Sequence, residues 1–488
     1  MATAVVDRMP TQRQEVRAQR RGGTQGLLRC RLMHADRVLN LTARAGLIVV
    51  AETLMALGLE GVVRRELRLR KRQRGLSEFD KLQAIVLLLA AGGDRIEDVR
   101  LLREDQALSR LLERAVPSPD ALHDFLYAFH DEQELARRPV MGAFIPKPSA
   151  ALVALSRINR ELVQRAVLPQ RPTVATLDLD ATIIESHKRD TKPHYKGGRG
   201  YQPTAVLWAE QDLVVADEYR DGNVPAGMST RAVAEQAFAA LPSSVTQRNF
   251  RGDSACYDER LLKWLVRSRI AFTISADMTK ELHAECSTPL LKWHLFEDRS
   301  DEVVALTEVE FTPGNWPKKA VPLRYVALRF SGKQGRLFSD GKDTKYLAVV
   351  SNRHDLAAAE LIRWHWQKAG TIEHLHDVTK NELAARLPPS GHFGANAAWY
   401  RLNLLTYNVL TTLKRQALPQ RLWDAEPKRL RYEVFSLPAL VTEHARQLTA
   451  KLGAATLSSD ELIAARSRLR DLHAQVTDGI AATNHSSA

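Results

Sequence analysis

The spacing of apolar residues divides the chain into a helical part and a part rich in strands, with the change near residue 170. Residues 46–59 and 79–91 carry apolar side chains at helical spacing, and the pattern continues through 94–112 and 120–130. Small or acidic residues stand where these helices would begin. We therefore predict a helical domain at 45–168.

From Thr173 onward, short runs of β-branched and apolar residues indicate strands. The first run ends in Asp178 and Asp180, and runs at 204–209 and 213–219 are separated by only three residues, which predicts an antiparallel hairpin. The elements expected next are a helix, a strand, a helix and a strand at 229–241, 245–253, 257–267 and 270–275. Three strands followed by helix, strand, helix and strand is the order of an RNase H-like α/β core with a mixed sheet.

The rest of the chain is expected to complete this core around an insertion. The core occupies 169–276 and 344–415, because a β-rich segment with Gly, Pro, Asn and Lys between its strands interrupts it at 277–343. Residues 416–488 are expected to form a helical C-terminal region and a tail.

Positive charge is concentrated near the N-terminus. The chain has a net charge of +13, and its first 75 residues hold 16 Arg and Lys against 6 Asp and Glu. Because such a charge favours a polyanionic partner, we expect a basic flexible arm at 1–44 and DNA binding by the helical domain at 45–168. Candidate DNA contacts, with a solvated helix face as the alternative, are Arg64, Arg65, Arg68 and Lys71.

Other sequence features narrow the class of protein. No apolar run is long enough to cross a bilayer and no signal-peptide pattern is present, so a cytoplasmic protein is expected. Cysteines at 30, 256 and 286 offer no CxxC pair and no ligand spacing with histidine. Neither disulfides nor structural zinc is therefore expected.

Carboxylates that are far apart in the sequence are expected to meet at one edge of the sheet. Asp178 and Asp180 share a face of one strand, and Asp253 ends another strand whose carboxyl end reaches the same edge. Glu373 lies in a later helix and could lean over that edge; a solvent-exposed charged stripe is the alternative. Carboxylate oxygens suit Mg²⁺, and two such ions about 3.5 to 4 Å apart serve phosphodiester cleavage and joining.

Several stretches resemble bacterial insertion-sequence transposases of the DDE class, in the group whose RNase H-like core carries a β insertion before the catalytic Glu. Together they span most of residues 40–415. The stretches are GGDRIEDVRLLREDQAL (92–108), LDLDATIIESH (177–187), YRDGNVPAG (219–227), RGDSACYDERLL (251–262) and RWHWQKAGTIEHLHDVTKNEL (363–383), followed by GANAAWYRLNLLTYNVL.

The resemblance implies catalytic and metal-binding roles for Asp180, Asp253 and Glu373, with two Mg²⁺ ions that Mn²⁺ can replace. Asp180 is followed by a small residue and Thr, as in that group, and Asp178 stays a further candidate ligand. The implied partners are DNA carrying the element's terminal inverted repeats and target DNA. A homodimer is implied when the protein assembles on DNA, in the bacterial cytoplasm near the nucleoid.

The group's Tyr-x2-Arg-x3-Glu-x6-Lys signature is half kept. Glu373 and Lys380 match it, whereas Trp366 and Ala369 occupy the Tyr and Arg positions. Lys368 is a candidate for the missing positive charge, and Lys380 is a candidate phosphate contact. Trp366 and Lys368 are therefore further candidate DNA contacts.

Further candidate DNA contacts lie in loops, each with an ordinary turn or solvated loop as the alternative. They are Lys188, Arg189, Lys192, Arg220 and Asn223. Some relatives form a DNA hairpin and stack a tryptophan on a flipped base. Candidates for that role in the insertion, with core packing as the alternative, are Trp293 and Trp316.

Two other functions fit part of the chain. Residues 178–182 match the Asp-x-Asp-x-Thr motif of haloacid dehalogenase-like phosphatases, in which the first Asp accepts a phosphoryl group and the second is an acid/base. The poorly apolar residues before Asp253 and the hairpin expected after the first motif count against that class. A non-catalytic DNA-binding relic of a transposase is the other alternative. The presence of all three carboxylates counts against it, and the altered Arg position keeps it open.

Overall fold

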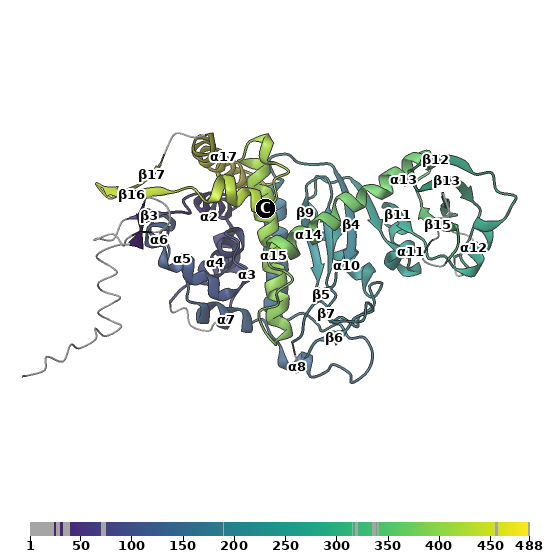
Figure 1. Ribbon diagram of the computed structural model, residues 1–488, viewed down its shortest axis with the longest axis horizontal. Helices are drawn as coiled ribbons and strands as arrows, with labels where there is room; N and C mark the ends of the chain where they lie inside the picture. The colour runs from purple at the N-terminus through teal and green to yellow at the C-terminus, as the bar shows by residue number, and fades with distance from the viewer. Residues whose placement is uncertain are drawn as a thin grey trace, which may run out of the picture.

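The computed structural model describes residues 24–25, 30–32, 40–69, 75–188, 190–314, 316–317, 321–333, 338, 341–453 and 457–486. Lys71, Arg189 and most of the expected basic arm lie outside these residues. Along its longest axis the molecule passes from a group of helices, through a sheet, to the strands of the insertion (Figure 1). None of the described helices is both long enough and apolar enough to cross a bilayer.

The N-terminal part is helical, as its apolar spacing predicts. Its elements are α2 (Leu47–Ala56), α3 (Leu59–Glu66), α4 (Glu78–Ala90), η1 (Ile96–Asp98), α5 (Val99–Glu104), α6 (Gln106–Leu112), α7 (Pro119–Tyr127), α8 (Glu132–Leu135) and α9 (Ala150–Ala166). α4 begins at a capping box between Ser77 and Asp80 and is buried along nearly its whole length. It packs against α2, α3 and α7, so it forms the centre of this group.

In the described part of the chain, nine strands form one mixed sheet in the order β12-β13-β14-β15-β11-β10-β4-β8-β9. The RNase H-like core consists of β4 (Val174–Ala181), β8 (Thr204–Trp208), β9 (Leu213–Glu218), β10 (Gln247–Gly252) and β11 (Ala271–Ser275). β8 is antiparallel to β4 and β9, whereas β10 is parallel to β4 and β11. The predicted element order and the predicted hairpin are therefore confirmed.

The strands of the insertion continue this sheet. They are β12 (His294–Asp298), β13 (Glu302–Val309), β14 (Arg324–Gly332) and β15 (Thr344–Ser351), and β15 pairs antiparallel with β11. α12 (Lys280–Ser287) contacts β15, while α13 (Ala358–Trp366) packs on apolar side chains of β13 and β14. Core and insertion thus share one sheet, which the sequence did not predict.

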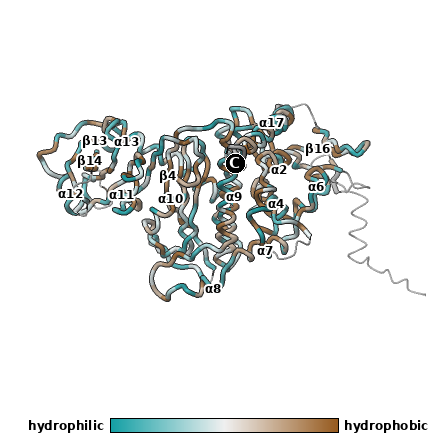
Figure 2. Tube along the Cα trace, turned by 180° about the vertical axis from the view of Figure 1, so that it is seen from behind, coloured by the Kyte–Doolittle hydropathy of each residue, from teal (hydrophilic) through white to brown (hydrophobic). Residues whose placement is uncertain are grey.

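Helices cover both faces of the core strands. α10 (Thr230–Ala240) and α11 (Glu259–Arg267) contact each other and the sheet, and α14 (Ile372–Glu382) and α15 (Phe393–Gln416) form the other helical pair. α9 and α15 pack together between the sheet and the N-terminal helices, which can be followed from both sides (Figures 1 and 2). α15 is buried over nearly its whole length, so it joins the two parts of the molecule.

The C-terminal region contains a hairpin in addition to the expected helices. β16 (Ala439–His444) pairs with β17 (Gln447–Leu452) and with β3 (Leu41–Thr42). The helical elements are η4 (Gln420–Leu422), α16 (Pro427–Leu430), the π-helical turn η5 (Arg431–Phe435) and α17 (Leu457–Ser486). The remaining short strands are β1 (Thr24–Gln25), β2 (Arg31–Leu32), β5 (Ile184–Glu185), β6 (Lys192–Pro193) and β7 (Arg199–Tyr201).

Candidate active site

Asp180 and Asp253 lie side by side because β4 and β10 are parallel neighbours, and the last paired residues directly precede the two acids. Asp253 caps the 3-10 turn η2 (Ser254–Cys256), and its carboxylate accepts a backbone N–H two residues on at 3.1 Å. Gly252 is needed before it, since a Cβ there would lie 2.7 Å from the Cys256 sulfur. The strand register therefore delivers two carboxylates to one edge of the sheet.

These two carboxyl groups are close enough to share a hydrogen bond. Burial, the negative charge of Asp180 and that hydrogen bond raise the pKa of Asp253, while the ammonium group of Lys368 opposes the rise. A buried pair of like charges stabilises the protonated form of one member unless a cation compensates the pair. The pair is therefore suited to bind a cation.

Asp178 is one half of a buried ion pair. It is completely buried, and Arg251, its neighbour on β10, binds both carboxylate oxygens at 2.6 and 2.8 Å. The hydroxyl of Thr371 donates to the same carboxylate. Both oxygens are thus engaged by protein donors, which argues against Asp178 as a further metal ligand; that role stays a prediction.

A break between two helices connects this ion pair to the segment that carries Glu373. α13 is followed by the 3-10 turn η3 (Gln367–Gly370), and α14 begins after Thr371. Arg251 donates to the Trp364 carbonyl at 2.8 Å and to the Gln367 side chain at 3.3 Å. The Asp178–Arg251 pair therefore fixes the helix break against the ends of β4 and β10.

Two lysines of this segment reach the strand that carries Asp180. The ammonium group of Lys368 lies 3.6 Å from Asp180 Oδ2. Lys380 donates to the Thr182 hydroxyl at 2.9 Å, and burial lowers the pKa of its ammonium group. Since Thr371 contacts the middle of β4 and Lys380 contacts the residue just beyond its end, α14 runs along β4 in the same direction.

Glu373 lies in the first turn of α14, at an exposed position. Within the described ranges it makes no hydrogen bond or ion pair, and it does not form a group with Asp180 and Asp253 whose oxygens all lie within 4.8 Å of one another. The structure brings the two aspartates together and places Glu373 on the neighbouring helix. The role of Glu373 as third ligand stays a prediction.

The predicted DNA contacts divide into exposed and buried residues. Arg220 is fully buried and donates to the carbonyls of residues 202, 226 and 228, so its prediction as a DNA contact was wrong. Asn223 is half-buried and donates to the carbonyl of residue 142 at 2.8 Å. The side chains that remain at least partly exposed are Lys188, Lys192, Arg64, Arg65 and Arg68.

The tryptophans predicted to stack on a base are both packed against protein groups. Trp316 is buried and its indole N–H donates to the Val321 carbonyl at 3.1 Å, so the core-packing alternative holds for it. Trp293 is half-buried, with its ring centroid 5.9 Å from that of Tyr346 and the Arg329 guanidinium 4.9 Å above it.

A cavity of about 390 Å³ adjoins Asp253 instead. Its apolar wall is formed by Met278, Leu328, Leu347, Val349 and Trp366. Its polar side groups belong to Ser254, Ser275, Asp277 and His365. The cavity therefore combines an aromatic surface with hydrogen-bonding groups directly beside the carboxyl pair.

One protein family matches nearly the whole chain. The model of the family described as Transposase DDE domain group 1 covers residues 33–474. The chain belongs to this family of DDE transposases. No curated protein matches it. Among solved structures it is similar to piggyBac transposase in a synaptic complex with hairpin DNA, with a TM-score of 0.41, 11% sequence identity, and coverage of 88% of this chain and 82% of that one.

Family membership makes this transposase a metal-dependent enzyme that cuts and joins DNA. Asp180 and Asp253 offer only oxygen atoms, the donors that Mg²⁺ and Mn²⁺ prefer. Burial and the charge of Asp180 raise the pKa of Asp253, so a cation beside the pair would stabilise its ionised form. The residues at this edge of the sheet therefore fit a divalent cation.

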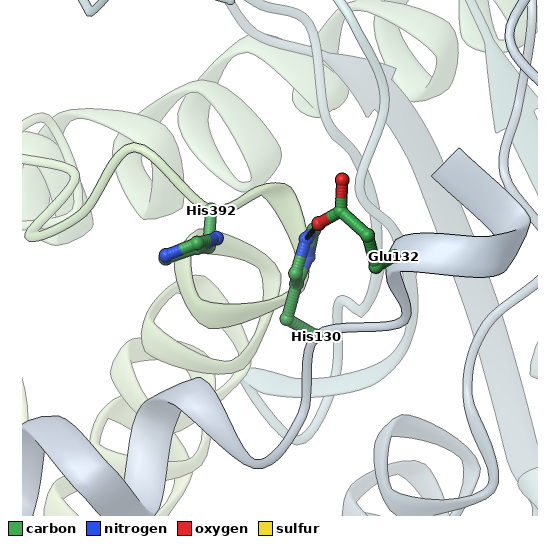
Figure 3. A group of neighbouring side chains, drawn as sticks. All are labelled: His130, Glu132 and His392. Carbon is green, nitrogen blue, oxygen red and sulfur yellow. Dashed lines mark hydrogen bonds and ion pairs between the residues drawn. The ribbon is translucent and has the colours of Figure 1, made fainter. Parts of the chain in front are cut away.

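A second cluster with metal-ligand side chains joins the N-terminal part of the transposase to α15. His130, Glu132 and His392 place ligand atoms within 4.8 Å of one another (Figure 3). The Gly394 amide donates to His130 Nδ1 at 3.2 Å, so the ring proton lies on Nε2 and is donated to Glu132 at 2.9 Å. A ring nitrogen that carries a proton has no lone pair for a metal ion. These residues therefore form a hydrogen-bonded contact between α7, α8 and α15.

Sequence reasoning missed two features of this transposase's site. Asp277 follows β11 at the same sheet edge, and desolvation and the charge of Asp253 raise its pKa. Its position after a strand that is parallel to β10 was a usable signal. The second missed feature is the ion pair between Asp178 and Arg251, which no sequence pattern within either strand indicates.

Proposed function

We propose that this transposase cuts the ends of an insertion sequence and joins the freed 3′-hydroxyl to target DNA, with Asp180, Asp253 and Glu373 as its catalytic residues. The observation that carries the proposal is the contact between the carboxyl groups of Asp180 and Asp253 at the ends of parallel neighbouring strands. Two divalent ions bound by these residues would activate the attacking oxygen and stabilise the leaving oxygen.

The residues of the chain supply the remaining requirements of this reaction. Asp180 and Asp253 are held by strand backbone, so their positions do not depend on flexible loops. Glu373 is proposed as the third ligand from the first turn of α14, the helix that follows Thr371 and its contact with Asp178. Lys380, beside Thr182, is placed to contact a phosphate of the DNA strand.

DNA is proposed to lie across the sheet edge that carries the two aspartates. The partly exposed Lys188 and Lys192 follow β4 and belong to the loop that borders this edge. Trp366 lines the cavity beside Asp253 and is proposed as the surface on which a base near the cut stacks. The Phe296 ring, 5.4 Å away, and the Arg299 guanidinium, 5.2 Å from the ring centroid, hold the indole in place.

The structure argues against the phosphatase alternative. That chemistry requires the first Asp of the motif, Asp178, to attack a phosphoryl group. Asp178 is completely buried and bonded to Arg251 and Thr371, so it has no free oxygen for the attack.

The test is nicking of DNA that carries the terminal inverted repeats found beside this reading frame, in Mg²⁺ or Mn²⁺. The full-length chain should nick at the repeat ends, and Asp180→Asn and Asp253→Asn should not. Asp471→Asn, which changes an exposed carboxylate of α17, is the matched control and should nick normally. Binding of the repeats without any nicking by the unaltered chain would support the DNA-binding relic instead.

A further inference from the structure

A positive charge of the protein itself lies at the carboxyl pair. The Lys368 ammonium group is 3.6 Å from Asp180 Oδ2, and its side chain is only 10% exposed. The charge also lowers the pKa of Asp253, against the effects of burial and of Asp180. The imidazoles of His365 and His376 are near the same charge, and burial lowers the pKa of each to about 3, so both are neutral at pH 7.

The backbone of Lys368 is fixed while its ammonium group is not. Its carbonyl accepts the Thr371 amide at 3.2 Å and the Thr371 hydroxyl at 3.0 Å. Arg251 holds the preceding residue, Gln367, at 3.3 Å. Within the described residues the ammonium group is in an ion pair with Asp180 and makes no hydrogen bond. A flexible four-carbon stem on a fixed backbone can move its charge by rotation alone.

We propose that Lys368 is the resident counter-ion of the Asp180–Asp253 pair and that a divalent metal ion must displace its ammonium group to bind there. The inference rests on the proposed function, because it concerns the same carboxylates. It differs from the role expected for Lys368 from the sequence, which was to replace a missing arginine at the DNA backbone.

Elementary electrostatics supports this competition. Two half-buried carboxylates without a cation repel each other, so an ammonium group nearby stabilises the metal-free fold. A divalent ion uses the same oxygen atoms and repels an ammonium group a few ångströms away. Lys368 therefore stabilises the metal-free transposase and weakens metal binding.

The experiment measures Mn²⁺ affinity of the full-length chain without DNA, by electron paramagnetic resonance of free Mn²⁺. Lys368→Met should bind Mn²⁺ about tenfold more tightly than the unaltered chain, because a charge near 4 Å in a partly hydrated site contributes on this scale. Lys368→Arg, which keeps the charge, should stay near the unaltered affinity. Lys263→Met, which removes a partly exposed lysine paired with Glu259 on α11, is the matched control and should change nothing.

Thermal unfolding supplies a second readout that needs no activity. In EDTA, Lys368→Met should unfold at a lower temperature than the unaltered chain. Saturating Mn²⁺ should raise the unfolding temperature of Lys368→Met by more than it raises that of the unaltered chain. Should Lys368→Met fold poorly, Lys368→Gln offers the same loss of charge with a polar side chain.

The outcomes separate this inference from the proposed function. Mn²⁺ binding that Asp180→Asn abolishes, with affinity unchanged or weakened in Lys368→Met, keeps the metal site and overturns the counter-ion role. No Mn²⁺ binding in either the unaltered chain or Lys368→Met overturns both. Binding that appears only after the lysine is removed supports the competition most strongly.

Discussion

Two pairs of side chains on the same two strands differ only in one partner, and that difference decides what each pair does. Asp178 on β4 faces Arg251 on β10, and both residues are buried and joined by two hydrogen bonds. Two residues further along, Asp180 meets Asp253, an acid instead of a base. The compensated pair fixes the fold. The Asp180–Asp253 pair has no partner of opposite charge on the two strands, so we call it the uncompensated pair. Lys368, from outside these strands, gives it a displaceable counter-charge, and the pair can attract an external cation. Proximity of aspartates in a motif therefore does not identify the ligands; their cross-strand partners do.

The largest expected effect comes from removing a carboxylate of the uncompensated pair. Asp180→Asn or Asp253→Asn should reduce metal-dependent nicking to the background rate, because each loses a charged ligand. Both variants should remain folded, since the substitution relieves repulsion between two acids. Gel assays of repeat-end DNA test the loss of nicking, and unfolding curves in EDTA test whether the variants stay folded. Normal nicking by either variant would remove the pair from the active site.

Breaking the compensated pair should cost stability instead. Arg251→Met leaves Asp178 buried without a partner, which should lower the free energy of unfolding by about 3 to 5 kcal/mol. Chemical denaturation measures it. Arg231→Met, which breaks the exposed pair with Glu235 on α10, serves as control and should change stability by less than about 1 kcal/mol. Equal effects for the two arginines would contradict the structural role of Arg251.

An intermediate effect is expected at the cavity beside the uncompensated pair. Trp366→Ala should slow DNA cleavage because it removes about 1 to 3 kcal/mol of DNA-binding free energy, the contribution of one base stacked on an aromatic ring. Mn²⁺ affinity should be unaltered, because Trp366 offers no ligand atom. Trp316→Phe, at a buried packing position, is the comparison and should leave cleavage intact. If Trp366→Ala cuts DNA normally, the stacking role is wrong.

A smaller effect concerns the pH dependence of stability without metal. Burial and the charge of Asp180 raise the pKa of Asp253, so the folded chain keeps a proton that the unfolded chain releases near its ordinary value of 3.8. The folded state binds more protons in the window above 3.8, and stability must fall as pH rises through it. Unfolding free energies in EDTA should show this fall for the unaltered chain and a weaker one for Asp253→Asn. Parallel pH curves for the two proteins would contradict the raised pKa.

The smallest effect is expected at Lys380. Lys380→Met removes one phosphate contact, so the slope of log affinity for DNA against log salt concentration should decrease in magnitude by about 1. Fluorescence anisotropy over a range of salt concentrations measures the slope. An unchanged slope would mean that Lys380 serves only the Thr182 contact.

The sequence predicted those parts of the site that follow from local patterns. An apolar run that ends in carboxylates located Asp180 at a strand end, and the RNase H-like order of elements located Asp253 at the end of a strand that reaches the same edge. The partner of Asp178 depends on strand register, because a shift of one residue would have moved Arg251 to the other face. Arg220, two residues before Gly222 in an expected turn, resembles a surface contact, and only the three carbonyls around it explain its burial.

Features that depend on packing between distant elements could not be predicted. The position of Lys368 depends on the 3-10 turn between α13 and α14, which the Arg251 and Thr371 contacts hold in place. Helical spacing alone would have continued one helix through that turn. The continuation of the core sheet by β12–β15 likewise depends on the pairing of β15 with β11, to which the sequence of either strand gives no guide.

The most direct test of the central claim is the location of bound metal. Crystals of the full-length chain in Mn²⁺ should give an anomalous difference peak between the carboxylates of Asp180 and Asp253, with Asp178 still bonded to Arg251. A peak at Asp178, or a Mn²⁺-dependent nicking enzyme with no peak at Asp180 and Asp253, would contradict the account.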